Sequence, residues 1–115
     1  ANLIEEISDL SRREKRRLEN LLIRLFEHLL KIKYWHSEKD DNQKHWKREI
    51  RNFRKQINRD LLASPSLRNY ALEKLDGLYQ DARELVSDAS GLSINNFPEK
   101  AIADLEKILD ENWLP

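Results

Sequence analysis

The sequence has 115 residues, the length of one domain with one modest core. Charged residues make up 37% of it, against roughly 25% in an average soluble protein, and it has only two glycines and three prolines. The absence of cysteine excludes disulfides, thiolate metal sites and cysteine nucleophiles, and no apolar run reaches the ~18 residues of a membrane-spanning helix. This composition favours an all-helical domain, which we expect in the cytoplasm and away from membranes.

The net charge is zero, but the two halves of the chain carry charges of opposite sign. Residues 1–59 contain 16 Lys and Arg against 10 Asp and Glu, and residues 60–115 contain 5 against 11, so the charges are +6 and −6. Such asymmetry indicates either contact of the basic half with nucleic acid, or attraction between the halves within the fold or in a dimer.

Hydrophobic spacing predicts helices along most of the chain, beginning with a short helical stub at residues 3–10. Ser11 and Glu14 have the spacing of a capping box, which starts a helix over residues 12–36. This helix is apolar over more than half of its circumference, as expected of a central helix that is contacted from several sides. The polar stretch SEKDDNQ at residues 37–43 then predicts a loop.

Three more helices are predicted after this loop. Apolar residues of the first recur every three or four positions, at Trp46, Ile50, Phe53, Ile57 and Leu61. Ser64 as N-cap and Pro65 as first helical residue begin the next, which ends at Gly91 and contains Gly77, a place for close helix approach. The last begins near Pro98. With no sustained alternation of apolar and polar residues, the sequence predicts an all-α fold, a bundle of four principal helices plus the stub.

The most basic stretch is KHWKREIRNFRKQINR at residues 44–59, with seven Lys or Arg and a single acid. At about 100° per residue, its apolar residues share one helix face, opposite six cations that we call the basic ridge: Lys44, Lys47, Arg48, Arg51, Lys55 and Arg59. Because aromatic and basic residues are on different faces, this helix lacks the stacking platform that binds single-stranded nucleic acid. Two interpretations remain open: a solvated face partly paired with acids of the second half, or a ridge that contacts phosphates.

No group of residues predicts catalysis. His28 lies on the rim of the apolar arc, where we interpret it as a packing residue. His36 and His45 bracket Glu38 and Asp41, but the spacing matches no common zinc or calcium pattern. We therefore expect no metal, no cofactor and no catalytic residue. An enzymatic site centred on His36, Asp41 and His45 would require a metal to copurify with the protein.

Several short motifs occur together in this chain. They are NLIEEISDL at 2–10, HLLK at 28–31, the pattern Trp46-x3-Ile50-x3-Arg54-x2-Ile57, SPSL at 64–67, Tyr79-x2-Ala82-Arg83, and FPE. In combination they resemble domain-of-unknown-function family 29 (DUF29), a bacterial, mainly cyanobacterial family, over nearly the whole chain. The resemblance implies an all-helical fold and no established activity. Family members usually have some tens of residues before NLIEEI. Together with the missing methionine, this predicts that 1–115 is a single domain lacking an N-terminal segment of a longer protein.

Arg54 and Arg83 are polar residues on the border of the predicted core. We expect each to form a charge-assisted hydrogen bond to an acid or to a helix C-terminus, and thereby to fix the register of the helices.

For function, the sequence predicts a non-enzymatic helical module that acts through a protein partner or as a homo-oligomer. Self-association would use the apolar girth of residues 18–34 or the tail at Trp113. The alternative is a module that contacts nucleic acid through the basic ridge.

Overall fold

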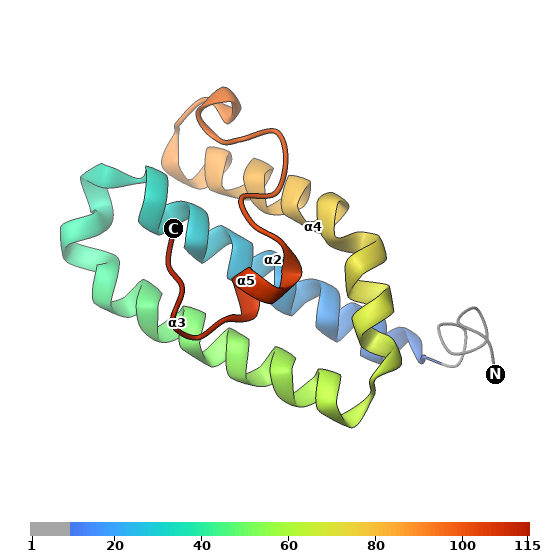
Figure 1. Ribbon diagram of the computed structural model, residues 1–115. Coiled ribbons are helices and arrows are strands. Elements are labelled where there is room, and N and C mark those ends of the chain that lie inside the picture. The colour runs from blue at the N-terminus through green and yellow to red at the C-terminus, as the bar shows by residue number, and fades with distance from the viewer. Residues whose placement is uncertain (1–9) are drawn as a thin grey trace.

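The computed structural model describes residues 10–115, which contain four α-helices and one short 3-10 helix. They are α2 (Arg12–Tyr34), α3 (His36–Ala63), α4 (Ser66–Ser90), η1 (Ile94–Asn96) and α5 (Leu105–Leu109). No strand occurs in this part of the chain, so the predicted all-α bundle is confirmed, with three long helices and a short fourth (Figure 1). Nearly all of the predicted stub at residues 3–10 lies outside the described residues.

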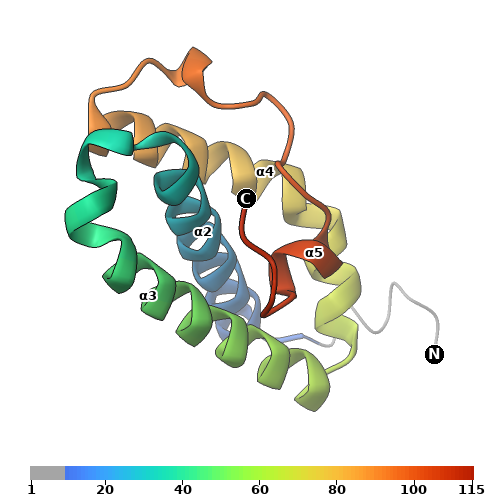
Figure 2. The same cartoon turned by 60° about the vertical axis from the view of Figure 1, so that its left-hand side comes forward.

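The central helix is α2. Its buried side chains are Leu18, Leu21, Leu22, Leu25, Phe26, Leu29, Leu30 and Ile32. Helices α3 and α4 pack along two sides of α2, and α5 lies between α3 and α4 where they would otherwise leave the core open (Figures 1 and 2). At the start of α2, the Ser11 hydroxyl accepts a hydrogen bond from the Glu14 amide (3.0 Å) and donates one to the Glu14 carboxylate (3.2 Å). The helix therefore begins where the capping pattern predicts.

The predicted loop at residues 37–43 is wrong, because these residues form the first two turns of α3. Only Trp35 interrupts the helical backbone, with φ −91° and ψ 69°. Its indole stacks on that of Trp46, with ring centroids 6.0 Å apart, and this contact stabilises the tight turn between the two helices. The polar run contains neither glycine nor proline, and polar residues alone do not prevent a helix that is continued by strong apolar packing further along.

Helix α4 begins one residue later than predicted, and Ser64 does not cap it through its side chain. Pro65 precedes the helix, and the Ser64 backbone carbonyl accepts from the Leu67 amide (3.0 Å). At the other end Gly91 has φ +75° and its amide donates to the Ser87 carbonyl (3.0 Å), the left-handed cap that the sequence predicts. Gly77 is exposed, and a Cβ there would meet no atom within 4 Å, so it permits no close helix approach among the described residues.

The last helix is much shorter than predicted. It begins at Leu105 and not near Pro98, and the Asp104 carboxylate accepts from the Lys107 amide (2.9 Å) as its cap. Residues 92–104 follow an irregular course that includes η1. The backbone carbonyls of residues 97–99 accept hydrogen bonds from α4 side chains, which holds this segment outside a helix. We call residues 92–115 the C-terminal strap.

Candidate functional site: the outward face of α3

All six side chains of the basic ridge are exposed, on the side of α3 that faces away from the core. Fifteen residues separate Lys44 from Arg59, so the ridge is about 22 Å long at ~1.5 Å per residue. Two ion pairs occur among residues 10–115, Arg17–Asp60 (2.7 Å) and Arg68–Glu106 (3.2 Å), and neither involves the ridge. Within the described chain, the predicted pairing of these cations with acids of the second half does not form.

At the C-terminal end of the ridge, the same helix face carries a leucine. Leu62 follows Lys55 by seven residues, which returns it to within about 20° of the same direction. It is 85% exposed, the most exposed large hydrophobic side chain of residues 10–115.

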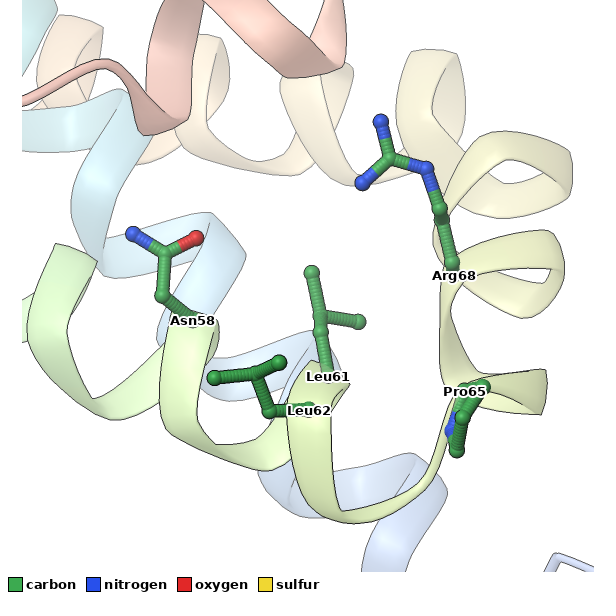
Figure 3. A pocket seen from close by; sticks show the side chains of 5 residues that line it. All are labelled: Asn58, Leu61, Leu62, Pro65 and Arg68. Atoms are coloured by element: carbon green, nitrogen blue, oxygen red, sulfur yellow. The ribbon is translucent and has the colours of Figure 1, made fainter.

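Beside Leu62 the surface is hollowed by about 410 Å³. Figure 3 shows the lining side chains, Asn58, Leu61 and Leu62 on the last turns of α3, with Pro65 and Arg68 at the start of α4. We call this the corner hollow. Arg68 is tied to Glu106 by its ion pair, which holds a charged group at the rim of an otherwise largely apolar depression.

Arg54 does not belong to this outward surface. Its side chain is 2% exposed, and its Nε donates to the Ile108 carbonyl (2.7 Å) while one terminal nitrogen donates to the Trp113 carbonyl (2.8 Å). Burial lowers the pKa of Arg54, and the nearby carboxylates of Asp110 and Glu111 act in the opposite direction. The guanidinium therefore binds the backbone of α5 and of the tail, and its burial leaves it inaccessible to an external ligand.

Arg83 has a similar arrangement on α4. Its Nε donates to the Phe97 carbonyl (3.2 Å), and its other contact is the Gln80 amide oxygen (3.3 Å), so no acid is its partner within residues 10–115. Next to it, the Tyr79 hydroxyl donates to the Pro98 carbonyl (2.6 Å), and burial raises the pKa of Tyr79 to about 12. Both arginines thus bond to backbone carbonyls at or just past the end of a short helix.

The histidines do not form a site. His28 is half-buried, its ring packs edge-on against Phe53 with centroids 5.2 Å apart, and its Nδ1 lies 2.7 Å from the Arg24 carbonyl. Burial lowers the pKa of His28. His36 and His45 are exposed on α3. In the described part of the chain, no three His, Asp or Glu side chains are grouped closely enough to hold a metal ion.

Both surfaces that the sequence indicated for self-association are occupied within the chain itself. The apolar residues of the girth at 18–34 are buried or packed against the core. Trp113 is half-buried, its carbonyl accepts from Arg54, and its ring lies 6.0 Å from the Lys107 ammonium. Among residues 10–115, no helix is long and apolar enough to cross a membrane.

A protein-family model for a domain of unknown function, DUF29, matches residues 1–114. The chain belongs to the DUF29 family. No curated protein and no solved structure matches it. In this DUF29 domain, the motif residues Trp46, Ile50 and Ile57 are buried in the core, and Arg54 fastens the strap to α3. Among the described motif residues, these four thus hold the bundle together.

Sequence reasoning placed the ridge of the DUF29 domain but missed the corner hollow. Leu61 was placed on the apolar face and is half-buried, whereas no prediction was made for Leu62, which is exposed. The exposure of Leu62 could have been predicted from the sequence, because a helical wheel at about 100° per residue places it on the same face as the cations of the ridge.

Proposed function

We propose that this DUF29 domain is a non-enzymatic protein-interaction module that binds its partner with the outward face of α3 and the corner hollow. The observation that supports it best is Leu62, 85% exposed beside a hollow of about 410 Å³. An exposed leucine contributes little to the stability of the free domain. Covering it with a partner's apolar side chain would contribute about 1.5–3 kcal/mol to binding.

The chemistry of this surface also defines the partner. Protein interfaces typically combine an apolar centre with a polar and charged rim. Here the hollow would take an apolar side chain, and the basic ridge would attract acidic groups beside it. A protein surface with both features fits this face better than phosphates alone, because phosphates have no apolar group that could cover Leu62.

The experiment is site-specific cross-linking in the protein's native cells. A photoreactive amino acid replaces Leu62, and in a matched control it replaces Leu72, which is 54% exposed on α4. We expect a discrete protein adduct at position 62 that the control lacks. Equal, diffuse labelling at both positions, or no adduct at position 62, would overturn the proposal.

A second candidate, contact with nucleic acid, is favoured by the six exposed cations without an ion pair in the described chain. A ridge that neutralises several phosphates gives an affinity whose logarithm falls with the logarithm of salt by about 0.9 per phosphate. Fluorescence anisotropy of labelled DNA and RNA at low and physiological salt measures this slope. Arg51→Glu with Lys55→Glu should weaken binding to every sequence about equally, whereas Lys74→Glu on α4 should leave binding unchanged. Absence of binding at low salt rejects this candidate.

A further inference from the structure

The outward face of α4 carries acids in an arrangement that matches the basic ridge. Four exposed carboxylates fall within about 80° of one another around this helix; we call them the acidic ridge: Glu73, Asp81, Glu84 and Asp88. Fifteen residues separate the first from the last, which gives a length of about 22 Å, equal to that of the basic ridge. No member forms an ion pair within residues 10–115.

The two ridges lie on opposite sides of the molecule. Helices α2 and α5 lie between α3 and α4, and both ridges are on the sides of their helices turned away from this core (Figures 1 and 2). The opposite charges of the two ridges are therefore held apart by the fold. One copy of the domain cannot bring them together.

Gly77 lies in the middle of the acidic ridge, four residues after Glu73 and seven before Glu84. Glycine is unfavourable in a helix interior relative to alanine, and it usually allows a close approach of another group. A Cβ at Gly77 would meet no atom within 4 Å, so nothing in the described chain requires its absence. It leaves a flat place among the acids where a long side chain from outside can lie against the helix.

We infer that the partner of this surface is a second copy of the chain, with the basic ridge of one copy against the acidic ridge of the next. The inference rests on the proposed function, because it names the partner that the outward face of α3 binds. Equal length and opposite charge make the ridges complementary, and Gly77 gives room for an arginine or lysine stem. Because the ridges face opposite directions, each contact leaves one ridge free at either end, so copies add in a row, head to tail.

Sedimentation velocity of the purified chain tests this at about 0.01 M and about 1 M salt, where the Debye length is about 30 Å and about 3 Å. We expect species larger than a dimer at low salt, growing with protein concentration, and a monomer at high salt. A monomer at both salt concentrations would overturn the inference. An adduct at position 62 with a different protein would leave the proposed function standing in that case.

Two variants test the head-to-tail geometry. Arg51→Gln with Lys55→Gln weakens the basic ridge, and Asp81→Asn with Glu84→Gln weakens the acidic one. Each variant should associate about tenfold more weakly than the wild type. Mixed together, they should form pairs and stop there, because each retains one intact ridge. Mixtures that grow as long as the wild type, or variants that associate normally, would contradict the proposed contact.

Gly77→Gln separates association from folding. Glutamine is a better helix former than glycine and has open space here, so the variant should melt no lower than the wild type. We expect its association to weaken at least about tenfold, because the side chain fills the flat place between the acids. Unchanged association would show that Gly77 is outside the interface and would overturn the docking of the two ridges.

Discussion

Replacing Arg54 with alanine is expected to lower the free energy of unfolding by about 3 kcal/mol. The guanidinium is 2% exposed and donates to the carbonyls of Ile108 (2.7 Å) and Trp113 (2.8 Å). A hydrogen bond from a charged group contributes about 1.5–3 kcal/mol, so two at the lower end of this range give about 3 kcal/mol. For a domain of this size, each 1 kcal/mol corresponds to about 4 °C, and the melting temperature should fall by about 12 °C.

Thermal unfolding followed by circular dichroism measures this loss, and hydrogen exchange locates it. Exchange in residues 105–115 should accelerate before that of α2, because the bonds removed hold the strap. Arg54→Lys keeps the charge, but a single ammonium group cannot donate to both carbonyls as the guanidinium does. Its melting temperature should therefore lie between those of Arg54→Ala and the wild type. Arg51→Ala, one turn earlier and exposed, should stay within about 0.5 kcal/mol. An Arg54→Ala melting curve that overlays the wild-type curve would refute a structural role for this arginine.

Four further substitutions are expected to change stability in a stated direction, which chemical denaturation can check. Gly77→Ala should raise the free energy of unfolding of the monomer by about 0.5–1 kcal/mol. Gly91→Ala should lower it by about 1–2 kcal/mol, because only Gly91 has positive φ. Equal effects of the two substitutions would contradict this reasoning. Tyr79→Phe should cost about 1 kcal/mol by leaving the Pro98 carbonyl without its donor, and a neutral result would show that water replaces the hydroxyl. Because burial lowers the pKa of His28 below its ordinary 6.5, the unfolded chain binds its proton more readily, so stability present above pH 6.5 should decline as pH falls below it. His28→Gln should flatten that decline, and an unchanged pH profile would assign it to other groups.

The long helices were predictable because their apolar residues recur at helical spacing and their ends carry local signals, as at Ser11 and Gly91. Two segments were not. Residues 37–43 are polar enough for a loop, but the chain turns in one residue at Trp35, a solution that depends on stacking with Trp46. Residues 98–104 have helical spacing, yet their course is set by hydrogen bonds to α4 side chains 19 positions earlier, which local spacing does not reveal.

Only part of the candidate site was likewise predictable from the sequence. The ridge follows from the periodicity of α3 alone, so its six cations could be placed from the sequence. Whether acids of the second half reach them depends on where α4 lies, and the local pattern of α3 contains no information about that. The contacts of Arg54 and Arg83 likewise join residues 14 to 59 positions apart, and their carbonyl partners leave no mark in the side-chain sequence.

Besides its buried side chains Phe97, Leu105, Ile108 and Leu109, the strap is held by its main chain. Arg54, Tyr79 and Arg83 all donate to backbone carbonyls, a group that every amino acid supplies. Its path therefore depends little on the identity of the side chains that it turns toward water. Exposed positions such as Lys100 and Asn112 are free to accept other residues or a label while the bundle keeps its shape. The strap is thus the natural place for this domain to tolerate variation, and for an experimenter to modify it.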